Sequence, residues 1–123
     1  MDKSKQTGKL GEQLAQDYLT AQGYAILESN WRSGHLEADI IAYKEGLIVL
    51  VEVKTRSSQS HGEPEDFVTP GKQQAYIKLA NAYVQTHWRD EEVRFDIISV
   101  TFNGDSYSLK HLENAFTAAG IYR

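Results

Sequence analysis

The sequence contains no cysteine, and only two prolines and one methionine among its 123 residues. The absence of cysteine excludes disulfide bonds, thiolate metal sites and a cysteine nucleophile, and it fits a reducing compartment. Long hydrophobic runs are also missing. The longest, Leu47–Val51, is far too short to cross a bilayer, and the N-terminus lacks the apolar segment of a signal peptide. We therefore expect a cytoplasmic protein with no membrane partner.

An excess of basic charge is lacking as well. The chain has 13 Lys and Arg against 17 Asp and Glu, which gives a net charge of -4. This balance argues against simple nucleic-acid binding, where a basic surface supplies the affinity. It does not exclude an enzyme that acts on nucleic acid, because carboxylates that hold a cation still count as fully negative in such a sum.

The hydrophobic pattern predicts one α/β domain over residues 1–123, a mixed sheet flanked by helices in the order α-β-β-β-α-β-β. Residues 1–7 are polar and are expected to be loose. Thr69 and Pro70 have the residue types of a helix N-cap and first helical position. The predicted elements are a helix over Gly8–Gln22, strands over Tyr24–Trp31, Leu36–Tyr43 and Leu47–Lys54, a loop over residues 55–68, a helix from Pro70 to about Thr86, strands over Val93–Phe102 and Tyr107–Leu112, and a short helix over Glu113–Ala119.

Charged residues close the second strand of the predicted central hairpin. Side chains alternate along a strand, so Glu52 and Lys54 share one face. Folding about the turn at Glu45 places Asp39 opposite either Val51 or Glu52, and a slip of one residue would reverse the face. In the second of these registers, Asp39, Glu52 and Lys54 converge on one patch, with Glu37 nearby.

Two carboxylates that close repel each other unless one takes up a proton or a cation lies between them. Mg²⁺ suits such a site because it prefers oxygen ligands and keeps several waters. Lys54 beside the ion could bind a phosphate, and metal-activated water would then hydrolyse a phosphodiester. The alternative is an ordinary ion pair between Asp39 and Lys54 across two solvent-facing strands. The apolar composition of both strands favours the metal site, since buried charge is costly without compensation.

The wider sequence resembles a known family. Asp39 followed by Glu52-Val53-Lys54 is similar to the D…ExK motif of the PD-(D/E)XK, or restriction-endonuclease-like, superfamily. The chain as a whole resembles its YraN-like family of small bacterial endonucleases, which is related to archaeal Holliday-junction resolvases. The segments that carry the resemblance are Gly8–Glu12, Ala15, Tyr18-Leu19, Gly23-Tyr24, Asn30–Arg32, Glu37–Ala42, Val51–Arg56, Lys72-Gln73, Arg94–Asp96 and His111–Phe116.

The resemblance implies a restriction-endonuclease-like sheet and a site for Mg²⁺, with Mn²⁺ as a substitute. The ion would be held by Asp39, Glu52 and the carbonyl of Val53, and Lys54 would be the catalytic lysine. It also implies a DNA substrate, including branched DNA of the Holliday-junction kind. Related resolvases act as dimers because a four-way junction needs paired cuts, so a homodimer is one option.

Further positions follow from the same resemblance. Glu12 and Glu37 match supporting acids of the family, although an acid such as Glu12 is favoured near a helix N-terminus in any case. The chain departs from the family pattern at Leu36, where glycine is usual, and at Ala38, which takes the place of the superfamily's proline.

Residues near the second helix and the aromatic residues have weaker functional signals. Lys72 and Gln73 open that helix, where a phosphate could meet backbone amides. We expect Lys72 to be solvated and Gln73 to be the better candidate for the site, together with His35. Trp31 and Trp88 are expected in the core or an interface, and Tyr76 and Tyr83 in the core. Thr55 and Arg56 could follow a DNA backbone.

The sequence leaves two functions open, besides a purely structural domain that has neither. The first is a metal-dependent endonuclease that hydrolyses DNA. The second, motivated by the acidic net charge, is a nucleic-acid-binding or protein-interaction module that keeps the nuclease fold without cutting.

Overall fold

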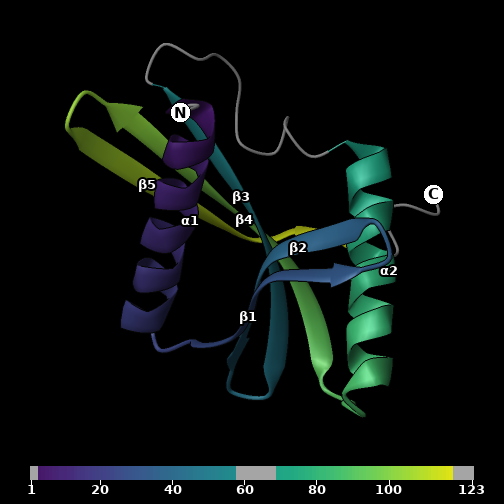
Figure 1. Ribbon diagram of the computed structural model, residues 1–123. Coiled ribbons are helices and arrows are strands. Elements are labelled where there is room, and N and C mark those ends of the chain that lie inside the picture. The colour runs from purple at the N-terminus through teal and green to yellow at the C-terminus, as the bar shows by residue number, and fades with distance from the viewer. Residues whose placement is uncertain (1–2, 58–68, 118–123) are drawn as a thin grey trace.

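The computed structural model describes residues 3–57 and 69–117. They form two helices and one five-stranded sheet (Figure 1), and the order of elements confirms the predicted α-β-β-β-α-β-β arrangement. The elements are α1 (Lys3–Ala21), β1 (Ala25–Ser33), β2 (Leu36–Lys44), β3 (Leu47–Ser57), α2 (Pro70–Thr86), β4 (Glu92–Asn103) and β5 (Ser106–Phe116). Neither helix in this part of the chain is long and apolar enough to span a membrane.

The five strands lie in the order in which they occur along the chain. All neighbouring pairs are antiparallel except β3 and β4, which are parallel. Parallel neighbours need a long crossover, and α2 lies within it. The β2–β3 hairpin turns at Glu45 and Gly46, both of which have positive φ, at 50° and 81°. This confirms the turn predicted at Glu45. Positive φ at both turn residues gives the backbone a twist that matches that of the flanking strands.

The helices cover opposite faces of the sheet, so the central strand is buried on both sides. One core lies under α1, where Leu19 packs with Val49 and Val51. The other lies under α2, where Leu79 packs with Leu50 and its neighbours. This explains why Leu47–Val51 forms an uninterrupted apolar run.

The sheet divides at one point, which we call the fork. The pairing of β2 with β3 ends at Ile40 and Val51. Beyond it, β2 stays paired with β1 as far as Leu36, whereas β3 continues beside β4 to Ser57. Figure 1 shows β1 and β2 turning toward α2, while the ends of β3 and β4 and the start of β5 lie away from it. Beyond the fork, a side-chain hydrogen bond from the N–H of Val53 to Asp39 links β3 with β2.

Three predicted boundaries were wrong. Residues 3–7 are helical rather than loose, because polar residues such as Lys and Gln extend a helix without showing a hydrophobic period. Thr55–Ser57 are strand rather than loop, since they continue the parallel pairing with β4. Glu113–Phe116 are strand rather than helix, because Phe116 pairs with Phe95 across a register shift. Residues 1–2, 58–68 and 118–119 of these predictions lie outside the described residues.

Candidate active site

Asp39 lies at the fork, directly after the last pair of the β2–β3 ladder. Because Ile40 pairs with Val51, the same register brings Asp39 to the level of Glu52. This register decides between the two that the sequence left open. The backbone pairing of the two strands stops here. In its place, Oδ2 of Asp39 accepts a hydrogen bond of 2.8 Å from the backbone N–H of Val53. The carboxylate is therefore fixed to β3 at the point where the strands separate.

Glu52 is buried next to Asp39, with 3% of its surface exposed. The hydroxyl of Tyr76, on α2, donates a hydrogen bond of 2.7 Å to Oε1 of Glu52. Its other oxygen, Oε2, faces two amines, the Nζ of Lys72 at 3.4 Å and the Nζ of Lys54 at 3.8 Å. Tyr76 also accepts a hydrogen bond of 3.3 Å from the backbone N–H of Asp39. The helix thus supports both members of the acid pair, by which we mean Asp39 and Glu52.

The acid pair carries more negative charge than its surroundings readily hold. Burial and the charge of Glu52 raise the pKa of Asp39 to about 8, against an ordinary value of 3.8. The hydrogen bond from Val53 opposes this rise, whereas hydrogen bonding with Glu52 and the charge of Glu12 add to it. Burial and the same two carboxylates also raise the pKa of Tyr76. Two adjoining acids in a poorly hydrated place are an arrangement that a bound cation would relieve.

Two more acids lie at the outer side of the pair. The side-chain amide of Asn30 donates to Glu12 at 3.1 Å and to Glu37 at 3.0 Å, and so joins α1 to β2. Glu37 is also paired with Arg32 at 2.8 Å. Asn30 has a positive φ of 52°, a conformation that asparagine tolerates better than most residues. These acids form a rim around the acid pair, and both match positions that the sequence had singled out.

The donor set fits a hard divalent cation held by few protein ligands. Within residues 3–57 and 69–117, no group of three or more His, Cys, Asp and Glu side chains is arranged to hold a metal. The available donors are the carboxylates of Asp39 and Glu52 and the carbonyl of Val53. Mg²⁺ commonly uses one or two carboxylates and keeps several waters. The chemistry therefore matches Mg²⁺ or Mn²⁺ better than Zn²⁺, which prefers four nitrogen or sulfur ligands.

Two residues of α2 contribute more than expected. Lys72 is exposed, as expected, and its Nζ also lies 3.4 Å from Oε2 of Glu52. Gln73 is a half-buried residue of the first helical turn. Tyr76, expected only in the core, uses its hydroxyl on both acids. The sequence signal was present, because Lys72 and Tyr76 are four residues apart and so share a helix face. His35 lines a pocket together with Glu37 and Lys72, which places it at the rim as well.

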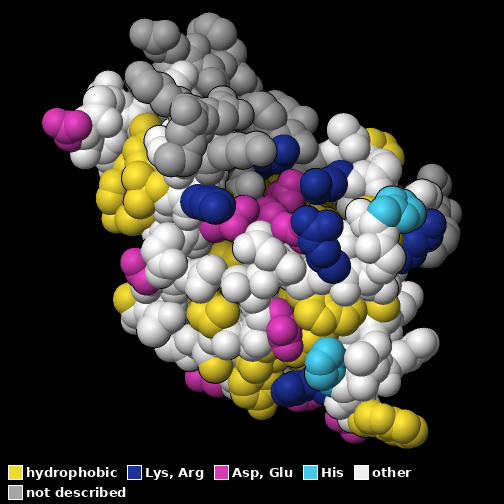
Figure 2. Space-filling model, viewed as in Figure 1, with side chains coloured by type: hydrophobic (Ala, Val, Ile, Leu, Met, Phe, Trp, Pro, Cys, Tyr) yellow, Lys and Arg dark blue, Asp and Glu magenta, His cyan; other side chains and the backbone are white. Residues whose placement is uncertain are grey.

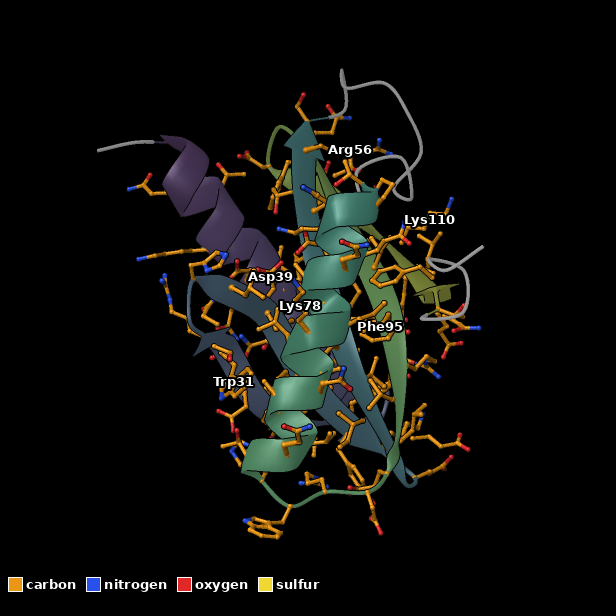
Figure 3. All side chains as sticks on the ribbon, turned by 90° about the vertical axis from the view of Figure 1, so that its right-hand side faces the viewer. Trp31, Asp39, Arg56, Lys78, Phe95 and Lys110 are labelled. Carbon is orange, nitrogen blue, oxygen red and sulfur yellow. The ribbon has the colours of Figure 1, made fainter. Side chains whose placement is uncertain are left out.

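The charges at this site are arranged as a core and a border. Figure 2 shows Asp and Glu side chains gathered at the centre of one face, with Lys and Arg side chains around them. Figure 3, turned by 90°, shows Asp39 beside α2 and Arg56 toward the far end of β3. Net acidity of the whole chain therefore coexists with a locally basic border, which is what a cation-assisted phosphate site requires.

Comparison with known proteins shows which family this arrangement comes from. A profile of the uncharacterised protein family UPF0102 matches residues 11–100. A UPF0102 protein of Flavobacterium johnsoniae is 48% identical over 120 residues, covering 94% of this chain and 98% of that protein. A UPF0102 protein of Thermodesulfovibrio yellowstonii is 45% identical over 109 residues, covering 89% and 94%, and one of Bacteroides fragilis is 44% identical over 109 residues, covering 89% and 90%. The match spans most of the chain and includes the acid pair, and it shows that this chain belongs to the UPF0102, or YraN-like, family.

Proposed function

We propose that the protein is a Mg²⁺-dependent endonuclease that hydrolyses phosphodiester bonds of DNA at the acid pair. The observation that carries this proposal is the contact of Asp39 with Glu52 at the fork, with the Nζ of Lys54 at 3.8 Å from Glu52. An ordinary salt bridge needs one acid and one base. Here two acids adjoin, and the amine lies to one side, where it can meet a second anion.

Each residue has a separate task in this proposal. Asp39, Glu52 and the Val53 carbonyl would hold the ion, which when bound supplies a polarised water and offsets phosphate charge. Lys54 directs its ammonium group toward the position of the scissile phosphate and stabilises the charge that develops there. Tyr76 keeps Glu52 in the orientation needed for ligation through its bond of 2.7 Å. Lys72 shares Oε2 of Glu52 with Lys54 and adds a further positive charge near the phosphate.

The resemblance to restriction-endonuclease-like nucleases and junction resolvases supports the same reaction and suggests branched DNA as a substrate. A second function has one specific observation in its favour, the net charge of -4. An acidic chain that does not hold a cation would bind DNA weakly. In that case the family fold would serve as a non-cleaving module, and the acidic charge favours protein interaction over nucleic-acid binding as its role.

A cleavage assay on supercoiled and four-way-junction DNA with Mg²⁺ or Mn²⁺ tests the proposal. We expect cleavage that EDTA abolishes and that Lys54→Ala reduces by at least a hundredfold, in the range seen when a transition-state stabiliser is removed. Lys78→Ala is the matched control, because Lys78 is an exposed lysine on α2. Cleavage that persists in both Lys54→Ala and Asp39→Ala would contradict the proposal. DNA binding that is independent of metal, without cleavage, would favour the module.

A further inference from the structure

The sheet face that α2 covers changes in character beyond the acid pair. Its apolar core includes Leu50 of β3 and Phe95 of β4, but no later residue of either strand among those described. Side chains alternate along each strand, and paired residues of neighbouring strands share a face. Past Glu52, the register therefore continues this face with two rows across β3, β4 and β5. These polar rows consist of Lys54, Ser99 and Lys110 in the first and of Arg56, Thr101 and Ser108 in the second.

The polar rows are made of cations and hydroxyls. Three of their six residues are Lys or Arg and three are Ser or Thr. Neighbouring strands lie about 4.8 Å apart, so the backbone positions of Lys54 and Lys110, two strands apart, are separated by about 10 Å. Lys54 and Arg56 are separated by about 7 Å along β3, which is comparable with the spacing of successive phosphates in a nucleic-acid strand. The Nε of Arg56 donates a hydrogen bond of 3.3 Å to the Thr101 hydroxyl, which ties the guanidinium group to its row.

The middle of the first row holds a hydroxyl that the protein leaves unsatisfied. Ser99 is 2% exposed, and its Oγ has no hydrogen-bond partner within the described part of the chain. Buried hydroxyls in proteins normally bond to a protein group, a water or a ligand. Ser99 lies between Lys54 and Lys110 in the register, so an oxygen atom that reaches this position from outside would meet two cations as well as the hydroxyl.

The outer cations of the rows lie on the side of the molecule that carries α2. Figure 3 looks from that side and shows Arg56 beyond the first turn of α2, with Lys110 beside it. Lys110 is exposed, and β5 is an edge strand of the sheet. Lys54 belongs both to the first row and to the candidate active site, because its Nζ lies 3.8 Å from Glu52. The polar rows are therefore continuous with the site.

We infer that the polar rows bind the sugar–phosphate backbone of DNA next to the scissile phosphate, without reading its bases. The inference rests on the proposed function and adds to it how the substrate is held. Lys, Arg and hydroxyl side chains are common partners of phosphate oxygens, and such contacts fix the position of DNA but carry no sequence information. The rows also lie on the face of a sheet rather than on an element that enters a groove of the duplex. The bound DNA is therefore selected without regard to its sequence at this surface.

Fluorescence anisotropy with two labelled 20-base-pair duplexes, one rich in A·T and one rich in G·C, tests this inference. Binding is measured with Ca²⁺ in the buffer at salt concentrations from 50 to 200 mM, and a gel verifies that the duplexes stay intact. Lys110→Gln should weaken the binding of both duplexes by the same factor, about fivefold at the lowest salt. It should also reduce the slope of log affinity against log salt by about one, because one phosphate contact is lost.

Three further variants separate the polar rows from general effects of charge. Lys110→Arg keeps the charge and should bind as the wild type does. Lys9→Gln removes an exposed lysine of α1, which covers the opposite face of the sheet, and should leave both the affinity and the slope unchanged. Arg56→Gln should act as Lys110→Gln does. Because Arg56 is half-buried and bonded to Thr101, thermal unfolding must first show that this variant is folded, and the exposed Lys110 gives an independent answer.

The inference and the proposed function fail in different ways. DNA cleavage by the wild type, together with unchanged DNA affinity and salt slope in Lys110→Gln, would overturn the inference alone. DNA binding that depends on Lys110, without cleavage of any DNA by the wild type, would overturn the proposed function and leave the polar rows as a DNA-binding surface. A loss confined to one of the two duplexes, or an equal loss in Lys9→Gln, would also contradict the inference.

Discussion

Within the described part of the chain, acids are buried in two places, and their charges are compensated in different ways. At the fork, Asp39 adjoins another acid, and its pKa is raised. On β4, Asp96 has a buried side chain and receives two hydrogen bonds of 2.8 Å from Arg94. His111 lies 2.7 Å from it, and the Asn114 amide donates at 3.0 Å. Burial alone would raise the pKa of Asp96, but these bonds outweigh it and lower the pKa.

The difference separates a structural acid from a candidate catalytic one. Asp96 has its charge compensated by the protein itself, and the same network reaches α1, because the Tyr18 hydroxyl lies 3.1 Å from Nδ1 of His111. Arg94 also holds the hydroxyl of Tyr24 at 2.7 Å. The negative charge of Asp96 is thus compensated by these side chains without a ligand. The acid pair at the fork, by contrast, is stabilised by a ligand that brings positive charge.

The largest effect on stability is expected at Asp96. Asp96→Ala removes the acceptor of the backbone N–H of Asn114 and the buried partner of Arg94, which keeps only its contacts with Glu113 and the Tyr24 hydroxyl among the described residues. It should lower the free energy of unfolding by about 3 kcal/mol. Urea denaturation measures this change. Asp105→Ala is the control, since Asp105 is an exposed acid in the β4–β5 turn and should change stability by less than about 0.5 kcal/mol. Equal effects of the two substitutions would show that the network does not anchor the fold.

Removing an acid at the fork should instead raise the free energy of unfolding. In EDTA, Asp39→Asn relieves repulsion with Glu52 and should raise the free energy of unfolding by about 1 kcal/mol. The same variant should lose the stabilisation that Mn²⁺ gives to the wild type. Chemical denaturation with EDTA and with Mn²⁺ measures both. A variant that is destabilised in EDTA would mean that Asp39 is a structural residue like Asp96.

The pH dependence of stability should differ between the two places. The raised pKa of Asp39 means that the folded state keeps a proton that the unfolded chain releases. Metal-free protein should therefore lose stability as the pH rises from 3.8 to about 8. The lowered pKa of Asp96 gives stability that is present above 3.8 and is lost as the pH falls below it. Denaturation in EDTA from well below pH 3.8 to above pH 8 tests both slopes, and Asp39→Asn should flatten only the upper one.

The smallest effect is expected at Tyr76. Tyr76→Phe keeps the buried ring but removes the hydroxyl that bonds to both acids, so it should reduce cleavage about tenfold through poorer positioning of Glu52. Tyr83→Phe is the matched control, because the Tyr83 hydroxyl makes only a long bond of 3.5 Å to Glu28, away from the site. Both variants should change the free energy of unfolding by about 1 kcal/mol or less. Unchanged cleavage in Tyr76→Phe would remove the Tyr76 hydroxyl from the mechanism.

Much of the site was predictable because it lies on one hairpin. The turn predicted around Glu45 limits the register to two options, and the apolar strand makes Glu52 and Lys54 conspicuous. The spacing of Lys72 and Tyr76 shows that they share a helix face. The contacts of these two residues and of Asn30 with the acids were not predictable, since they depend on how separate elements pack. The hydrogen-bond network around Asp96 was not predicted from the sequence, for the same reason. Its partners Arg94 and His111 looked like ordinary strand residues until the β4–β5 pairing and α1 placed them together.

A crystal soaked in Mn²⁺ and examined by anomalous scattering tests the central claim most directly. We predict one strong peak between the carboxylates of Asp39 and Glu52, and we expect this peak to be absent in Glu52→Gln. A soaked crystal with no peak there, while the two carboxylates keep their contact, would contradict the claim that a cation completes this site.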